Sequence, residues 1–199
     1  MRRIIVFDRV SADGYFASAD GMLDWVVPDP EIDRATSSGL SSDGTILFGR
    51  RTYEMFASFW PRALDDAGPA NPHDRADTSS AAMRAFAVWL NAATKYVFST
   101  TLGEASWRNS HLRRALDPAE IAALKRQPGD DILVFGSGTL VGQLTAHGLV
   151  DEYQLVVAPL LLGRGRSLGA DVPTRSRLEL REARAFPSGN VMLRYARSA

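Results

Sequence analysis

Residues 45–54 read Thr-Ile-Leu-Phe-Gly-Arg-Arg-Thr-Tyr-Glu, and this stretch decides both the fold and the chemistry that we expect. An apolar, strand-like run ends at a glycine. Two arginines and a threonine follow at the point where a helix-like segment begins. Backbone N–H groups at a helix start attract anions, and the two guanidinium groups add positive charge. The stretch therefore predicts a phosphate-binding corner at the carboxyl end of a strand.

A second corner follows another apolar run, Ile-Leu-Val-Phe at residues 132–135. It offers glycines and hydroxyl groups without charge, in the order Gly136, Ser137, Gly138, Thr139. One corner suits a lone phosphate monoester and the other a pyrophosphate, so the pair suggests a phosphorylated dinucleotide such as NADPH. The second corner matches neither the GxGxxG fingerprint, because its third glycine comes one residue late, nor the GxSxG nucleophile elbow.

The two arginines at residues 50 and 51 also have a simpler interpretation as solvated charges at a helix start. Cations at that position oppose the helix dipole, however, and repeating the unfavourable choice calls for a compensating anion. A bound phosphate would supply one.

Composition limits the remaining possibilities. The chain has 199 residues, with 45% hydrophobic and 23% charged residues, which is ordinary for one soluble globular domain. Basic and acidic residues balance at 23 each, so net charge gives no reason to expect nucleic acid or a membrane surface as a partner. There is no cysteine, which excludes disulfides and thiolate nucleophiles. We find neither a signal-peptide core nor a membrane-spanning segment and expect a cytoplasmic protein.

Apolar periodicity predicts strands alternating with helices. The expected strands are residues 3–7, 45–49, 95–99, 132–135 and 152–158, and the expected helices are 31–42, 52–59, about 80–90, one from 118, and 139–147. Such alternation predicts a largely parallel sheet with helices on both faces and ligands at the carboxyl ends of its strands. Residues 178–185 and 191–195 predict a closing antiparallel hairpin, and residues 61–80 a surface loop.

Metal binding is not expected. The three histidines, His73, His111 and His147, are scattered and lack the spacing of metal ligands. The acidic residues between 65 and 77 read as a solvated loop rather than a calcium site.

Taken in order, the motifs resemble the dihydrofolate reductase superfamily, and most closely its branch related to the C-terminal reductase domain of the bacterial riboflavin-biosynthesis deaminase-reductase. The resemblance extends over nearly the whole chain. Its pieces are S-x-D-G-aromatic at residues 11–16, G-R-x-T-aromatic-E at 49–54, small hydroxyl residues at 99–101, a glycine pair at 136–138, L-V-D-E at 149–152 and P-x-x-L-G at 159–163.

This resemblance implies a single α/β domain, NADPH as cofactor, hydride transfer to a pteridine- or pyrimidine-like ring, and a homodimer. The cofactor-binding residues that it implies are Gly49, Arg50, Arg51, Thr52, Ser99, Thr100, Gly136, Ser137, Gly138 and Thr139. Asp13, Gly14 and Tyr15 would line the nicotinamide side, with Asp13 as a catalytic candidate and with Tyr15 and Trp25 beside the substrate.

One departure from the family concerns the buried acid that dihydrofolate reductases carry at the start of their first helix. Matching Trp25 and Pro28 to the family's tryptophan and proline puts Pro30 near that place. We therefore expect the acid at Glu31 or Asp33, or no acid at all. A missing acid would favour the alternative of a non-catalytic protein that binds a nucleotide or another ligand. A hydrolase has no nucleophile–base constellation to support it.

Overall fold

The computed structural model describes residues 1–37, 44–65, 81–173 and 175–198, and it is built on an eight-stranded sheet in the order β5-β4-β3-β6-β1-β7-β10-β9. The central strand β1 (Ile4–Ser11) runs parallel to both neighbours, β6 (Ile132–Val134) and β7 (Glu152–Ala158). Beyond β6, the parallel run continues through β3 (Thr45–Gly49), β4 (Thr94–Phe98) and β5 (Ser110–Arg113). The expected parallel sheet is confirmed.

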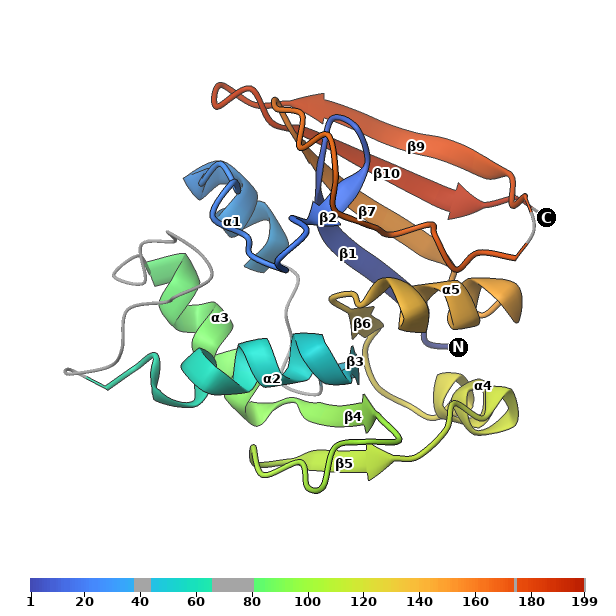
Figure 1. Cartoon of the computed structure of the whole chain (residues 1–199). Helices are drawn as coiled ribbons and strands as arrows, with labels where there is room; N and C mark the ends of the chain where they lie inside the picture. Colours follow the sequence, from blue (N-terminus) through green and yellow to red (C-terminus); the bar gives the residue numbers. More distant parts are fainter. Residues whose placement is uncertain (38–43, 66–80, 174, 199) are drawn as a thin grey trace.

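The other side of the sheet closes with an antiparallel hairpin. Strand β10 (Val191–Arg197) pairs antiparallel with β7 and with the edge strand β9 (Leu178–Ala185). These strands form the upper part of the molecule in Figure 1. This hairpin is also the one that the alternating sequence pattern predicts.

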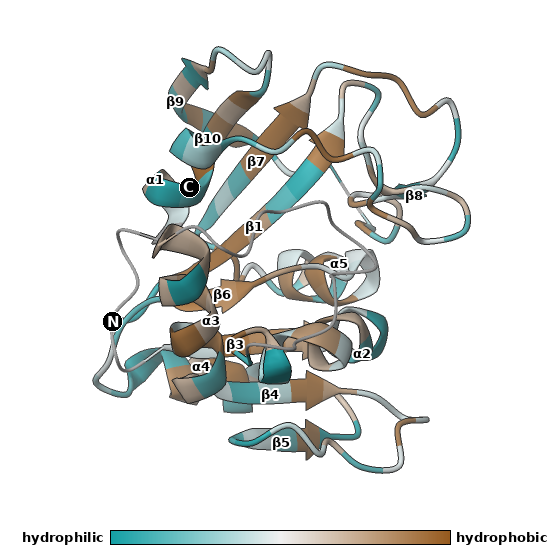
Figure 2. Cartoon of the chain, turned by 90° about the vertical axis from the view of Figure 1, so that its left-hand side faces the viewer, coloured by the Kyte–Doolittle hydropathy of each residue, from teal (hydrophilic) through white to brown (hydrophobic). Residues whose placement is uncertain are grey.

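Helices cover both faces of the sheet (Figure 1). Helices α4 (Pro118–Arg126) and α5 (Gly138–Ala146) pack their leucines on one face, against Ile4, Val6 and Leu47. Helices α2 (Arg50–Phe59) and α3 (Ala81–Ala92) pack on the other face, around Phe48. Helix α1 (Pro30–Ser37) lies on that second face too, with Ile32 against β7 and β10. Figure 2 shows the apolar residues of β3 and β6 at the centre of the molecule.

Several short elements were not expected from the sequence. Strand β5 is polar, and strands β2 (Tyr15–Ala17) and β8 (Arg166–Ser167) form a separate two-stranded sheet. Strand β1 also runs to Ser11 instead of ending near residue 7, because its second half pairs with β7. Trp60–Arg62 forms a short 3-10 helix in which Trp60 is buried. Two expected segments lie outside the described residues, namely residues 66–80 of the loop and residues 38–42 of the first helix.

Helix starts fall into two kinds. Asp29 accepts hydrogen bonds from the first N–H groups of α1, and Asp117 caps α4 in the same way. Helices α2 and α5 begin without a side-chain cap and without an acidic residue in the first turn. Both follow parallel strands, so both start at the same edge of the sheet. None of the helices in the described ranges has the length and apolar character that a membrane span requires.

Candidate functional site

The starts of α2 and α5 meet at the carboxyl edge of the sheet. Gly49 is the N-terminal flanking residue of α2, and Ser137 holds the same place in α5. A methyl group built on Gly49 would lie 2.3 Å from the Ser137 Oγ atom, so only glycine allows the two corners to approach this closely. The two predicted phosphate corners therefore form one continuous surface.

That surface is the floor of a cleft of about 1360 Å³, which we call the large cleft. Residues from three separate segments predicted for the cofactor line it, namely Gly49, Arg50, Arg51, Thr52, Ser99, Thr100, Ser137, Gly138 and Thr139. Gly136 is buried next to them, with φ of 63°, in the left-handed region that favours glycine. The structure thus brings together the residues that the two corners and the hydroxyl segment contribute.

The arginines of the large cleft differ in their pairing. Arg50 forms an ion pair with Glu54, 3.0 Å between Nη1 and Oε2, one turn along α2. Arg51 is exposed and pairs with no carboxylate among the described residues. Arg114 also lines the cleft, and its Nη1 donates to the Leu102 carbonyl at 2.6 Å. Arg114 was missed in the sequence because it lies in no recognisable motif.

The β2–β8 sheet and the segment after it close one side of this cleft. A Cβ atom on Gly138 would lie 3.0 Å from the Ser167 carbonyl oxygen, so this segment crosses the start of α5 in close contact. The Thr139 hydroxyl donates to the Asp171 carboxylate at 2.8 Å. Ser167 and Asp171 accordingly line the cleft beside α5.

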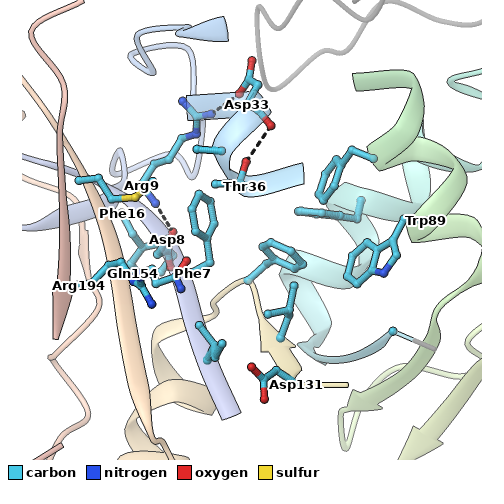
Figure 3. A pocket seen from close by; sticks show the side chains of 18 of the residues that line it. Phe7, Asp8, Arg9, Phe16, Asp33, Thr36, Trp89, Asp131, Gln154 and Arg194 are labelled. Atoms are coloured by element: carbon cyan, nitrogen blue, oxygen red, sulfur yellow. Dashed lines mark hydrogen bonds and ion pairs between the residues drawn. The ribbon is translucent and has the colours of Figure 1, made fainter. Parts of the chain in front are cut away.

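A second, smaller cavity of about 560 Å³ lies next to the large cleft, and we call it the aromatic cavity. Its aromatic walls come from β1, α2, α3 and the end of β6, and include Phe7, Phe56, Phe86, Trp89 and Phe135. Figure 3 shows Trp89 on one side of this space and Asp8, Gln154 and Arg194 on the sheet side. Asp8, Phe16, Leu23, Met55 and Phe135 line both cavities, so the two spaces meet there.

Asp8 is the acidic group at this junction. Its Oδ1 accepts the Arg9 N–H at 2.9 Å, whereas its Oδ2 is buried and has no hydrogen-bond partner among the described residues. A Cβ atom on Gly136 would lie 3.1 Å from that oxygen. Burial raises the pKa of Asp8 to about 7, because a carboxylate is poorly solvated there. Asp8 was missed in the sequence; an acid that follows the apolar run at residues 4–7 was the available signal.

The carboxyl groups expected on α1 lie in different places. Asp33 lines the aromatic cavity, where its Oδ1 accepts from Arg9 at 3.0 Å. Glu31 lines neither cavity and forms a half-exposed ion pair with Arg184, 3.3 Å apart. Of the two, the structure brings only Asp33 toward the site.

Four other predicted residues also lie outside both cavities, namely Asp13, Gly14, Tyr15 and Trp25. Asp13 is exposed and accepts hydrogen bonds from the Ser11 hydroxyl and from the Leu162 and Gly163 N–H groups, which hold its pKa below the ordinary range. It fastens a loop. Tyr15 and Trp25 do not line the cavities, although their near neighbours Phe16, Leu23 and Val26 do.

Within the described ranges, no three His, Asp or Glu side chains gather in a set that would hold a metal ion. The groups that line the two cavities are carboxyl, guanidinium, hydroxyl, aromatic and backbone N–H groups.

The fold and the site define an α/β protein of the dihydrofolate reductase type. A family model for the RibD C-terminal domain matches residues 2–192, and the chain belongs to this family. It is 31% identical to the uncharacterized protein YyaP of Bacillus subtilis (strain 168) over 98% of this chain and 94% of that protein.

Solved structures share this fold. A protein of Shewanella sp. PV-4, provisionally named for riboflavin biosynthesis, has a TM-score of 0.70 and 23% identity, with 99% of both chains covered. A deaminase and 5-amino-6-(5-phosphoribosylamino)uracil reductase of Thermotoga maritima has a TM-score of 0.61 and 15% identity, covering 99% of this chain and 57% of that one. The match to the RibD C-terminal domain confirms the family that the sequence motifs predict.

Proposed function

We propose that this protein is an NADPH-dependent reductase that transfers hydride to a small pteridine- or pyrimidine-like ring. One observation carries the proposal. Segments predicted independently to hold a phosphorylated dinucleotide line a single cleft, and that cleft meets an aromatic cavity at a buried acid. The family to which the chain belongs supports a reductase.

The large cleft fits NADPH in its chemistry. Two uncapped helix starts offer free N–H groups, and a pyrophosphate suits those of Ser137, Gly138 and Thr139. Arg50 and Arg51 lie at the other corner, where a 2′-phosphate would pair with guanidinium groups. Ser99 and Thr100 supply the adjoining polar wall. NADPH, when bound, supplies the hydride, and the protein supplies orientation and a dry site.

Asp8 is the proposed proton donor. It lies where the cleft and the aromatic cavity meet, and a pKa of about 7 leaves a large protonated fraction near neutral pH. A ring that accepts hydride gains negative charge and needs a proton. The aromatic walls exclude water and hold a flat ring beside the carboxyl group. Asp33 remains the second candidate from the sequence, but its carboxylate already forms an ion pair with Arg9.

The alternative is a protein of this fold that binds a nucleotide without turning a substrate over. The buried, unpartnered oxygen of Asp8 favours the enzyme, because leaving such a group unpaired costs stability and such costs concentrate at functional sites.

Cofactor preference tests the proposal. The purified protein is titrated with NADPH and with NADH, and nucleotide fluorescence is followed. We expect NADPH to bind more tightly. Replacing both Arg50 and Arg51 by Ala should weaken NADPH binding by roughly 2–4 kcal/mol while NADH changes little. Arg181→Ala, on the exposed edge strand and away from both cavities, is the control. Equal wild-type affinity for the two nucleotides contradicts the assignment.

A further inference from the structure

The aromatic cavity has a polar side as well as an aromatic one. Arg9 and Gln154 lie on β1 and β7, and Asp33 reaches the cavity from α1 above them (Figure 3). Trp89 faces them from α3. A ligand in this cavity therefore contacts rings on one side and charged groups on the other.

Among the described residues, every arginine that lines the aromatic cavity forms an ion pair with a carboxylate. The ion pairs are Arg3 with Asp131 and Glu152, Arg9 with Asp33, Arg184 with Glu31, and Arg194 with Glu152 and Glu182. A carboxylate partner lowers the net attraction that a guanidinium group offers an anionic ligand, most of all where the two charges are shielded from water and salt.

The pair between Arg9 and Asp33 is the most enclosed of these. Arg9 is the least exposed of these arginines, with 21% of its side chain exposed against 35% for Arg194 and about half for Arg3 and Arg184, and Asp33 is 19% exposed. Shielding from water and salt makes charge interactions stronger. Arg9 would therefore be the strongest anion-binding group of this cavity if Asp33 did not neutralise it.

We propose that Asp33 is a specificity residue that cancels the charge of Arg9, so that the aromatic cavity selects an uncharged, flat nitrogen heterocycle over its phosphorylated counterpart. This inference rests on the proposed function, since it takes the cavity as the place of the substrate ring. A phosphate beside Arg9 would face the Asp33 carboxylate and would have to displace it. A neutral ring stacks on the aromatic side and leaves the pair intact.

The test uses a matched pair of probes, uridine and uridine 5′-monophosphate, and Asp33→Asn, which frees the Arg9 guanidinium with little change in shape. Binding is measured by calorimetry without NADPH, so the result does not depend on cofactor binding. We expect the wild type to bind uridine more tightly than uridine 5′-monophosphate in this cavity. We expect D33N to shift the affinity ratio toward uridine 5′-monophosphate by about tenfold or more, as a charge-assisted hydrogen bond would.

Two further variants locate the effect. Arg9→Gln added to D33N should abolish the gain, because it removes the freed cation. Glu179→Gln frees Arg181 on the edge strand, outside both cavities, and should produce no gain. Any phosphate binding in the large cleft is common to all these proteins and cancels in the comparison. An unchanged ratio in D33N, or a gain that survives R9Q, overturns the proposal.

Discussion

At the scale of single residues, burial of the Asp8 carboxyl group lowers the stability of the fold at neutral pH, and we expect this group to act as the proton donor. Its pKa in the fold is raised to about 7, whereas an aspartate in an unfolded chain titrates near 4. Between those values the folded protein keeps a proton that the unfolded chain has released. Stability contributed at this site therefore falls as pH rises from about 4 to about 7 and is flat above that.

Asp8→Asn should remove this pH dependence. The difference in unfolding free energy between D8N and wild type should be roughly 3 kcal/mol more favourable to D8N at pH 8 than at pH 4.5. This figure follows from about 1.4 kcal/mol per pKa unit. Urea denaturation at the two pH values measures it. NADPH binding should survive in D8N and turnover should fall by roughly a hundredfold or more. A D8N difference that is constant with pH contradicts this role for burial.

Asp20→Asn provides the matched control. Asp20 also lines the large cleft, but it is exposed, and a hydrogen bond from Ser18 lowers its pKa. The sign is then reversed, because a lowered carboxyl pKa adds stability above pH 4 that is lost as pH falls. D20N should therefore lose stability at neutral pH and leave turnover in place.

Some of these residues could be predicted from the sequence, and others could not. Arg50, Arg51 and the residues around Ser137 were predicted because glycines, hydroxyls and charges directly follow apolar runs. Asp8 was missed because strand pairing, not local pattern, extends β1 through it, as its register with Leu155 shows. The side chains of Tyr15 and Trp25 lie outside both cavities, and their direction depends on contacts that the sequence does not display.

At the scale of elements, helix α1 is held in place by its cap. Asp29 is 4% exposed, and its Oδ1 accepts from the N–H groups of Glu31 and Ile32 at 2.8 and 3.3 Å. Its other oxygen accepts from the Ser188 hydroxyl in the β9–β10 turn. Burial works to raise the pKa of Asp29, but the hydrogen bonds from Ser188 and the helix start outweigh it and keep the pKa low.

Asp29→Ala should lower the free energy of unfolding by about 1–3 kcal/mol, because it removes the helix cap and leaves buried N–H groups without a hydrogen-bond acceptor. Asp117→Ala, at the exposed start of α4, removes a comparable cap and should cost about 1 kcal/mol. Thermal unfolding at pH 7 measures both. The amount by which D29A loses more stability than D117A should shrink as pH falls through the low pKa of Asp29, because the charged form of Asp29 makes the cap. Equal losses in the two variants contradict a special role for the Asp29 cap.

The long apolar elements were predictable, and the short polar ones were not. The apolar runs of β3, β6 and β7 are flanked by glycine, proline or acidic residues, and this pattern predicts both the type of each element and its position. Strand β5 reads Ser-His-Leu-Arg and is a strand only because β4 offers it a parallel edge. Strands β2 and β8 similarly depend on each other across a large sequence separation.

At the scale of the whole molecule, we expect a two-fold symmetric homodimer. Leu161 is 75% exposed after β7, and Leu178 and Leu180 are 40% and 53% exposed on the edge strand β9. Exposed apolar groups beside an open strand edge are typical of surfaces that another chain covers. Light scattering at micromolar concentration should give about twice the chain mass of 21.7 kDa.

Leu161→Asp should shift this assembly toward the monomer. Val88→Asp is the control, since Val88 is 56% exposed on α3, far from these strands in the sequence and on a different element. A wild-type mass near 21.7 kDa rules out the dimer.

The most direct test of the central claim is a crystal structure of the protein with NADP⁺ bound. We expect the 2′-phosphate at Arg50 and Arg51, the pyrophosphate at Ser137–Thr139, and the nicotinamide beside Asp8, facing the aromatic cavity. A nucleotide bound outside the large cleft, or one whose nicotinamide lies away from Asp8, would contradict it.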